Sequence, residues 1–400
     1  MINVLLILLL LSLLVIIHEL GHYLMAKKFG VAVEEFGFGY PPRILSLFKI
    51  KETLFSLNAI PFGGFVKLRG EEADTSNAGA SRSVKSSLAS EAGEESKKTS
   101  LSVDKNSLDG VFFLKPMLPR IAIISAGPLF NLIFGMVAFS VIFSFSGIPV
   151  PLDNQPRILQ TLENSPAAQA GVEAETSIIA FVYQGETTPV SSIDDVQKYV
   201  TAHAGQEVTV ITSGLCREES CQEVSQSFNL YLRTAEETPA GEGSMGIVFS
   251  DFYLKFYPWY EMPFRGIVYG IGQALAMGWL MVTGIVQLFT NLFLGNGLPV
   301  DVAGPVGIAH QAQKSDLLAQ GWLMVLNFMG LLSINLAVMN ILPIPALDGG
   351  RILMILMEKV IGKSRVDKVE GYVNYGGFIA LMGLIILITF KDVARIVQGN

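Results

Sequence analysis

Long uncharged apolar runs dominate the pattern of hydrophobic and polar positions along the chain. The runs are Met1–Ile17, Ile121–Leu152, Gly266–Val300, Leu317–Leu347 and Gly371–Phe390. Each approaches or exceeds the roughly 20 residues that a helix needs to cross a bilayer. The pattern therefore predicts a polytopic α-helical membrane protein. The first run has no basic region before it and no small-residue cleavage site after it, so we expect a mature helix that continues to residue 28, not a signal peptide.

The segments between these runs are of three kinds, which differ in composition and in hydrophobic pattern. Residues 29–70 include NAIPFGGFVKL, whose paired glycines predict a β-hairpin that approaches the membrane from the cytoplasmic side; an ordinary cytoplasmic hairpin is the alternative. Residues 71–110 are rich in Ser, Glu, Ala, Lys and Gly, which predicts a disordered cytoplasmic insert. Residues 154–237 alternate short apolar runs with the helical stretch SIDDVQKYVTA, which is typical of a small α+β domain.

Charge predicts which segments lie on which side of the membrane. Residues 26–120 hold 14 Lys and Arg against 11 Asp and Glu, whereas residues 147–265 hold 6 against 16. Because basic residues concentrate in the cytoplasm, we expect the first segment inside and the second outside the cell's inner (plasma) membrane. Half of the residues are hydrophobic and only 16% are charged, unlike in soluble domains. The net charge of −7 argues against a nucleic-acid partner.

Both cysteines of the chain, Cys216 and Cys221, fall in the acidic segment. A disulfide that closes a small hairpin tip would suit an oxidising compartment. Two unpaired thiols fit the same spacing, so the sequence leaves both states open.

The stretch IIHELGHYLM places polar residues inside the first apolar helix. His18 and His22 are four residues apart, so both imidazoles project from one helix face and can reach one Zn²⁺. Glu19 lies about 100° further round the helix, where it can act on water instead of binding the metal. Each ionised group inside a bilayer costs about 2.5 to 3.5 kcal/mol. A zinc ion or a hydrated cavity would offset this cost; hydrogen bonds to neighbouring helices are the alternative.

A third zinc ligand is expected in NILPIPALDGGR, residues 340–351. Pro343 and Pro345 end the preceding apolar helix, because proline lacks an amide hydrogen and restricts the residue before it. Asp348 then falls on a non-helical corner, which is tolerated at membrane depth only beside protein or a cavity. Asp348 could instead cap the helix that follows, but the histidine pair favours a ligand role.

Several motifs together resemble the site-2 protease family of intramembrane zinc metalloproteases, closest to the bacterial regulator-of-sigma-E type. The motifs are HELGH, IPFGGFVKL, KPMLPRIAIISAGPLFN, VAGPVGIA and NILPIPALDGG. The run NSPAAQAGVEAETSI is similar to PDZ domains of bacterial envelope proteases, although the chain has room for one PDZ domain only. A spacer domain without a ligand is the alternative for that segment.

The resemblance implies the chemistry of the site. Zinc would be the cofactor, held by His18, His22 and Asp348, with Glu19 as the general base. The residues expected to contact substrate are Gly63, Gly64, Asn131, Asn340, Pro343 and Pro345. Asn131 matches a G-x-x-x-N motif of the family, but tight helix packing explains its glycine, Gly127, equally well.

The expected function is hydrolysis of peptide bonds within or near transmembrane segments of single-span proteins. The resemblance implies anti-sigma factors or remnant signal peptides as substrates, in regulated intramembrane proteolysis, with the PDZ domain receiving a peptide or protein tail outside. A membrane scaffold with a structural metal is a second possibility, but a closed metal site needs no base such as Glu19. A zinc carrier is a third, and it would require further acidic residues along the spans.

The motifs also predict the number of spans. If the first span runs inward, Asp348 must reach the same half of the membrane as His18 and His22. A single crossing between Arg265 and Asp348 achieves this, so Gly266–Leu294 should be interfacial or re-entrant, which leaves four spans with both termini outside. The expected segments are helix 1 (1–28), hairpin region (29–70), insert (71–110), helix 2 (118–148), PDZ domain (154–237), interfacial region (258–300), helix 3 (317–342), ligand corner with its helix (343–358) and helix 4 (371–390).

Overall fold

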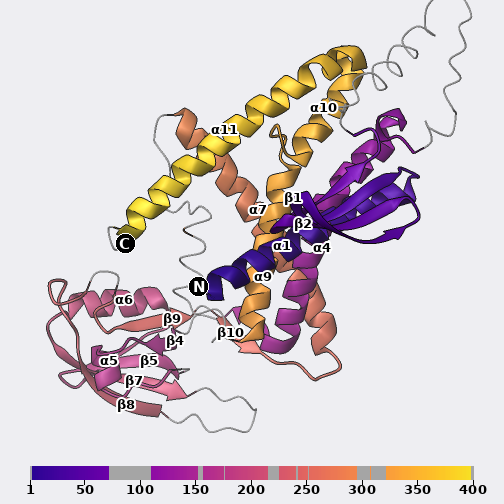
Figure 1. Ribbon diagram of the computed structural model, residues 1–400. Coiled ribbons are helices and arrows are strands. Elements are labelled where there is room, and N and C mark those ends of the chain that lie inside the picture. Colours follow the sequence, from indigo (N-terminus) through magenta and orange to yellow (C-terminus); the bar gives the residue numbers. More distant parts are fainter. Residues whose placement is uncertain are drawn as a thin grey trace, which may run out of the picture. The chain divides into compact units, whose positions relative to one another are not determined.

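The computed structural model describes residues 2–71, 110–151, 156–174, 176–214, 225–239, 242–250, 252–294, 307 and 321–397. They form two compact units, one of Met1–Phe145 with Pro263–Asn400 and one of Ser146–Met262 (Figure 1). The first unit holds the long helices and a curled sheet, and the second holds a small α+β domain. Nearly all of the predicted insert, residues 72–109, lies outside the described residues, and so do both cysteines.

Long apolar helices make up most of the first unit. They are α1 (Ile2–Lys28), α4 (Met117–Ser146), α7 (Met262–Phe293), α9 (Trp322–Ile341) and α11 (Lys363–Val397), accompanied by the shorter α10 (Asp348–Ile361) and the 3-10 helix η2 (Phe112–Leu114). The five long helices each contain a stretch long and apolar enough to cross a membrane. The prediction of a helical, multi-pass membrane protein is therefore confirmed.

The predicted number of four spans differs from the five candidate helices, and α7 is the reason. This segment is one unbroken helix of 32 residues, not a re-entrant one. Its Gly266 and Gly270 lie against the backbone of Ser144 and Ser140 on α4, so closely that a Cβ at either glycine would collide. Small residues at such contacts let apolar helices approach in a membrane. Gly266 and Gly270 are thus contact positions between two helices.

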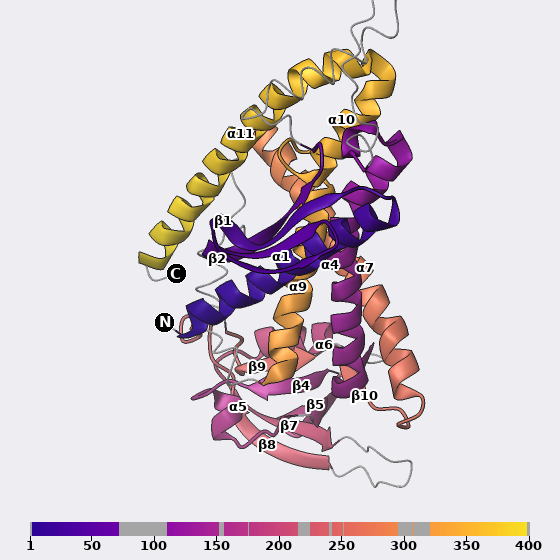
Figure 2. The same ribbon diagram turned by 45° about the vertical axis from the view of Figure 1, so that its right-hand side comes forward.

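Helices α1, α4, α7 and α9 pack side by side (Figure 2). Phe139 and Ile142 of α4 share a buried cluster with Ala274 of α7 and Ile334 of α9. The packing of α1 on α9 buries a second cluster, Leu10, Leu14 and Met329. One buried hydrogen bond links α9 to α4, because the Ser333 hydroxyl donates to the Asn131 carbonyl at 2.8 Å. These contacts bring the histidine-bearing part of α1 alongside α4 and α9.

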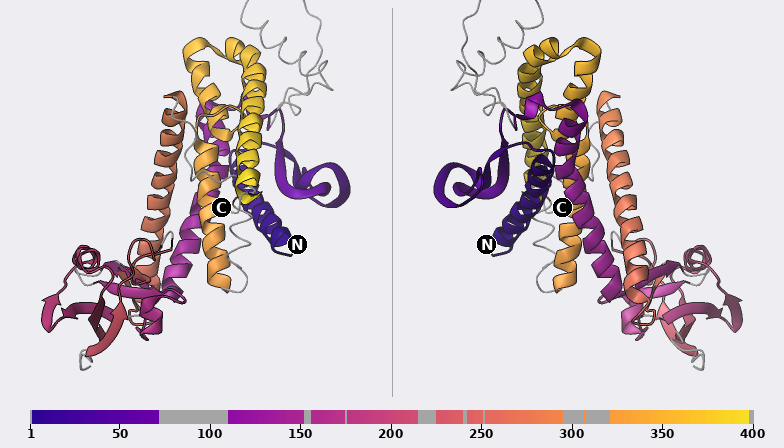
Figure 3. Two further views of the ribbon diagram at one scale, coloured as in Figure 1. Left: turned by 90° about the vertical axis from the view of Figure 1, so that its left-hand side faces the viewer. Right: turned by 90° about the vertical axis from the view of Figure 1, so that its right-hand side faces the viewer.

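Two unusually long strands form the sheet of the first unit, β1 (Val33–Ile50) and β2 (Thr53–Leu68). Both strands bend, so that Phe36 of β1 pairs with Phe55 and also with Val66, on opposite halves of β2. The result is a ribbon that curls on itself, seen nearly end-on in Figure 3. The curl places the second half of β2 against α1.

The second unit contains a six-stranded antiparallel sheet with a separate two-stranded ribbon. The sheet order is β8-β7-β5-β4-β9, with β6 pairing with β5. Its elements are β4 (Arg157–Thr161), α5 (Pro166–Gln169), β5 (Thr176–Tyr183), β6 (Glu186–Pro189), α6 (Ile193–Ala202), β7 (Glu207–Gly214), β8 (Ser225–Tyr231) and β9 (Ile247–Ser250). The ribbon pairs β3 (Ile148–Pro151) with β10 (Phe252–Lys255).

Local sequence signals explain the elements of this domain. Ser192 and Asp195 form a capping box that starts α6, with the Ser192 hydroxyl accepting a hydrogen bond from the Asp195 amide. Alternation along β5 and β7 buries Ile178, Phe181 and Val210 in one core beneath α6. The α+β domain expected from residues 154–237 thus extends to Ser250.

Candidate metal centre

Three predicted ligand residues converge at one point of the first unit. His18 Nε2 lies 3.0 Å from Asp348 Oδ2, His22 Nε2 lies 3.4 Å from the same oxygen, and the two nitrogens are 3.1 Å apart. Among the described residues this is the one group of three or more ligand side chains close enough to hold a metal. The two histidines come from α1 and the aspartate from the first turn of α10, more than 320 residues later.

The distances between these atoms fit a zinc ion. A tetrahedral zinc with bonds of about 2.0 to 2.1 Å has ligand atoms roughly 3.3 to 3.4 Å apart. The oxygen Asp348 Oδ2 is buried and makes no hydrogen bond within the described residues, although both imidazoles are near. A buried carboxylate oxygen that faces two ring nitrogens in this way is suited to binding a cation between the three atoms. The residues present therefore fit a zinc ion with one position left open.

A hydrogen bond fixes the ring orientation of His22. Its Nδ1 lies 2.9 Å from the carbonyl oxygen of Ile123 on α4. A carbonyl can only accept, so Nδ1 carries the proton and Nε2 keeps its lone pair for a metal. Partners of this kind behind a ligating histidine set its tautomer.

The side-chain amide of Asn131 on α4 contacts the ring of the other histidine, His18. Its side-chain nitrogen lies 3.3 Å from His18 Nδ1, while its oxygen is buried with no hydrogen-bond partner in the described structure. Rotating the Asn131 side-chain amide by 180° exchanges its oxygen and nitrogen, and the oxygen then accepts the proton of His18 Nδ1. This arrangement frees His18 Nε2 for the metal. The predicted substrate contact at Asn131 does not match its placement, because the residue is fully buried behind His18.

We expect Asn131→Leu to weaken zinc binding by about 10- to 100-fold, because the substitution removes the acceptor behind His18 at similar volume. Asn131→Asp is the matched variant, since it keeps an accepting oxygen and should retain most of the affinity. Competition with a chelator of known affinity measures both. Equal zinc retention by the leucine variant and the unsubstituted chain would contradict the orienting role of Asn131.

Gly127 leaves the space in which the metal would lie. A Cβ at this position would fall 2.7 Å from His18 Nε2 and closer still to His22 Nε2. The backbone of α4 therefore passes directly over the two ligand nitrogens, and only glycine fits there. Helix packing was the alternative explanation for Gly127. The structure shows in addition that this glycine leaves room for the ligand nitrogens of His18 and His22 beside α4.

The corner between α9 and α10 positions Asp348. Leu347 occupies the N-cap and Asp348 is the first residue of α10, so the carboxylate does not cap the helix. A Cβ at Gly349 would collide with the carbonyls of Ile341 and Leu342, and one at Gly350 with the carbonyl of Ile344. The two glycines thus let the start of α10 fold tightly back on the end of α9, which turns Asp348 toward the histidines.

Helix α11 supports this corner from outside. Ala346 has a φ of +74°, a conformation that residues with a side chain seldom adopt. Its amide lies 3.5 Å from the Asn374 side-chain oxygen, and Pro345 packs where Gly377 leaves room. Pro345, predicted to contact substrate, thus contacts α11. Pro343 is exposed, and the half-buried Asn340 side chain makes no hydrogen bond with any described residue.

Strand β2 contacts the face of α1 that carries Ser12, Ile16 and Glu19. The Gly63 amide donates to the Ser12 hydroxyl at 3.3 Å, and a Cβ at Gly64 would lie 3.8 Å from Glu19 Cγ. The predicted Gly63 and Gly64 therefore lie beside the predicted base. The ring of Tyr40 covers Gly63. Burial and the Glu19 carboxylate both raise the pKa of Tyr40, so its hydroxyl keeps its proton.

An ion pair near the site was missed by sequence reasoning. Arg351, three residues after Asp348, pairs with Glu71 at the end of β2, and the other Glu71 oxygen accepts from the Leu68 amide at 3.2 Å. The pair ties the sheet to the helix that carries Asp348. Neither residue stands out in the sequence, because a charge pair 280 positions apart leaves no local pattern.

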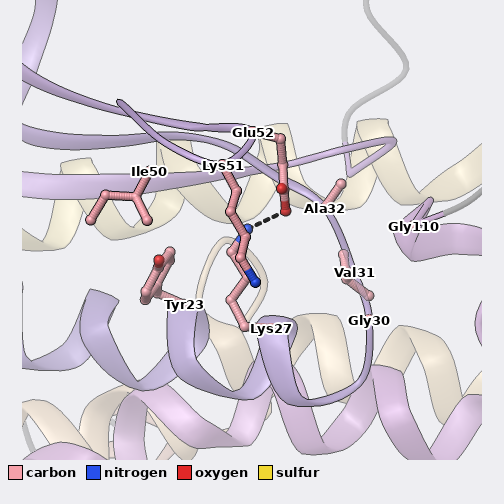
Figure 4. Close-up of a pocket in the computed structure, with 9 residues that line it drawn as sticks. All are labelled: Tyr23, Lys27, Gly30, Val31, Ala32, Ile50, Lys51, Glu52 and Gly110. Carbon is pink, nitrogen blue, oxygen red and sulfur yellow. Dashed lines mark hydrogen bonds and ion pairs between the residues drawn. The ribbon is translucent and has the colours of Figure 1, made fainter. Parts of the chain in front are cut away.

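A hollow of about 680 Å³ lies further along α1, beyond the ligands (Figure 4). Tyr23 and Ile50 line it, and Lys27 bonds to Glu52 across it. None of the three metal-ligand residues lines this hollow. It is therefore separate from the metal centre.

Comparison with known proteins agrees with this geometry. The family model described as Peptidase family M50 matches residues 6–384. Proteins named as zinc metalloproteases from Clostridium acetobutylicum, Brucella suis and Clostridium perfringens are each 28% identical to the chain. The alignments cover 98%, 96% and 96% of this chain and 97%, 92% and 96% of the relatives. Because the match runs from before His18 to beyond Asp348, the chain belongs to peptidase family M50, the zinc metalloproteases of the site-2 protease family.

Proposed function

We propose that the chain cleaves peptide bonds within or near transmembrane segments of single-span membrane proteins, in regulated intramembrane proteolysis. The observation that carries this proposal is the position of the metal centre on α1, a helix long and apolar enough to span a membrane. A water-dependent reaction at such a site acts on substrates that lie in the membrane themselves. Substrates of the anti-sigma-factor or remnant-signal-peptide type fit this requirement.

Glu19 is the residue that moves protons in this proposal. Zinc, when bound by His18, His22 and Asp348, supplies a Lewis acid that makes water nucleophilic near neutral pH. Glu19 is not among the converging ligands and lies one position from His18, where it can accept the proton of the attacking water. It then returns this proton to the leaving amine. Asn131 and Ile123 keep both imidazoles aimed at the metal during these steps.

Strand β2 is proposed to present the substrate. A helical substrate keeps its peptide bonds in internal hydrogen bonds, so it has to unwind before it can be cleaved. An extended segment could add to β2 at Gly63 and Gly64, which lie beside Glu19, through main-chain hydrogen bonds. The unpaired Asn340 amide, at the end of α9, is a further candidate to hold the substrate backbone.

The second unit is proposed to be a PDZ-like domain outside the cell's inner membrane. Its β9 is the last strand in the order of the sheet, which leaves one edge of β9 for an added peptide strand. Ile247 and Phe249 of β9 pack on the same core as α6. The charge bias of residues 147–265 supports the outside location. This domain would bind the tail of a substrate on that side before the membrane segment of the substrate is cut, as the resemblance to the regulator-of-sigma-E type implies.

Cleavage of a single-span model substrate tests the proposed function. The substrate carries a tag at each end, the purified full chain is assayed in detergent, and mass spectrometry maps the products. We expect cuts inside or next to the apolar segment, loss of cleavage after removal of zinc by a chelator, and recovery after zinc is restored. Cleavage confined to the water-exposed tags, with the apolar segment intact, would overturn the intramembrane assignment while leaving a zinc protease.

A further inference from the structure

The ribbon of β3 and β10 carries an apolar face that the domain does not bury. Phe252 and Leu254 alternate along β10 and are 45% and 49% exposed, and Phe256 follows at 65%. Residues two apart on a strand point to the same side, so Phe252 and Leu254 share one face, and Phe256, just after the strand, packs with Leu254 against Gly147. Pro151 pairs with Phe252 and Pro149 with Leu254, which extends the same face onto β3.

Further exposed aromatic residues follow β10 along the chain. Trp259 is 86% exposed and Tyr260 is 57% exposed, with their rings in edge-to-face contact at 6.1 Å. Lys255 lies over the ring of Tyr257, 5.0 Å from its centre. Large aromatic and apolar groups exposed together are unusual on a soluble surface and mark an interaction site. We call the set of Pro149, Pro151, Phe252, Leu254, Phe256, Trp259 and Tyr260 the aromatic face.

The connections of the ribbon decide what this face meets. Strand β3 begins two residues after α4 ends at Ser146, and α7 begins at Met262, only two residues after Tyr260. Both helices are candidate membrane spans. Two extended residues reach at most about 7 Å, so Ile148 of the ribbon and Tyr260 are held near the level at which the helices leave the membrane. Gly147 strengthens this constraint, because Phe256 and Leu254 pack directly against it.

We infer that the aromatic face docks on the lipid bilayer, at the boundary between headgroups and acyl chains on the side where α4 ends. Tryptophan and tyrosine prefer this boundary because one end of each ring system is apolar and the other can hydrogen-bond to water or headgroups. The docked ribbon restrains the sheet domain at the membrane surface, instead of leaving it on a free tether.

A chain with a single tryptophan tests this inference directly. The chain has three tryptophans, and Trp279→Phe with Trp322→Phe leaves Trp259 as the reporter. The full chain is placed in phosphatidylcholine vesicles with bromine atoms either near the headgroup end or deep in the acyl chains. We expect bromines near the headgroups to quench Trp259 emission strongly, deep bromines to quench it weakly, and acrylamide in the water to have little effect.

Two further results decide between occupants of the face. Emission that acrylamide quenches fully and bromolipids do not would overturn the inference. Protection from both quenchers that disappears on dilution of protein in the vesicles would also overturn it, because a second copy of the chain would then cover the face.

A matched pair of variants links the reporter to the ribbon. In the Trp259 reporter, Phe252→Ser with Leu254→Ser removes two members of the aromatic face and should shift Trp259 emission toward that of water-exposed tryptophan. Leu159→Ser removes an equally exposed apolar residue, 52% exposed on β4, and should leave the emission unchanged. An unchanged emission in the first variant would show that the ribbon does not hold Trp259 in lipid.

Discussion

Glu19→Gln is expected to abolish cleavage of a membrane substrate while the chain keeps about one zinc per molecule. Glutamine has the size and shape of glutamate but cannot accept the proton of the attacking water. Loss of general-base catalysis costs about 10²- to 10⁴-fold in rate. Zinc should stay because the converging ligands are His18, His22 and Asp348, and Glu19 is not one of them. The rate of product formation and the metal content of the purified protein measure the two effects.

An exposed carboxylate supplies the control for this result. Glu186→Gln changes the same group on β6, in the other unit of the chain, and should leave the rate unaltered. A Glu19→Gln variant that cleaves at the rate of the unsubstituted chain would remove Glu19 from the mechanism. A variant that loses its zinc would instead show that Glu19 helps to hold the metal.

Gly127→Ala is expected to lower zinc affinity by at least about 100-fold and to abolish cleavage with it. The new methyl group would lie 2.7 Å from His18 Nε2 and closer to His22 Nε2, where real Cβ atoms essentially never lie. The backbone of α4 cannot retreat easily, since it is held to α9 by the Ser333 hydroxyl, which donates to the Asn131 carbonyl at 2.8 Å. The imidazoles must therefore rotate away from the point that they share with Asp348. Zinc content after dialysis and competition with a chelator measure the loss.

Gly272→Ala is the matched control, because this glycine of α7 has nothing within 4 Å of an added Cβ. Alanine is the better helix former by about 1 kcal/mol, so the control should be as stable as the unsubstituted chain or more so. If Gly127→Ala bound zinc with unchanged affinity, the imidazoles would have to lie further from α4 than described here.

The local part of the metal centre was predictable from sequence. Two histidines four apart share a helix face by geometry alone, which defines half of the site without any tertiary information. Asp348 required more, because nothing in its own neighbourhood brings it to His18; the need for a third ligand and the prolines that end the preceding helix pointed to it, and the resemblance to a known family agreed. The reasons for Gly127, Gly349 and Gly350 could not be predicted, since each depends on which backbone passes within contact distance in the folded chain.

Two features of the fold show where pattern analysis fails. The positions of the zinc motifs suggested an interfacial or re-entrant segment at Gly266–Leu294, yet the chain there forms one helix of 32 residues, whose Gly266 and Gly270 permit close packing on α4. The hairpin expected within residues 29–70 is present, but its turn lies at Lys51 and Glu52 and not at the glycines of NAIPFGGFVKL, and β1 pairs twice with β2. Exposed apolar side chains lie on both faces of the end of β1, at Ile44, Leu45, Leu47, Phe48 and Ile50, so this stretch shows no clean alternation from which a strand could be recognised.

The distance in sequence between the zinc ligands has a consequence for biosynthesis. The histidines belong to α1, and Asp348 follows 348 − 22 = 326 residues after His22. At about 5 to 20 residues per second, the ribosome needs roughly 15 to 65 s to add the third ligand. During that interval α1 can enter the membrane without a complete centre. Proteolytic capacity thus arises only after Asp348 has been synthesised, so a chain terminated before this residue would be harmless to neighbouring membrane proteins.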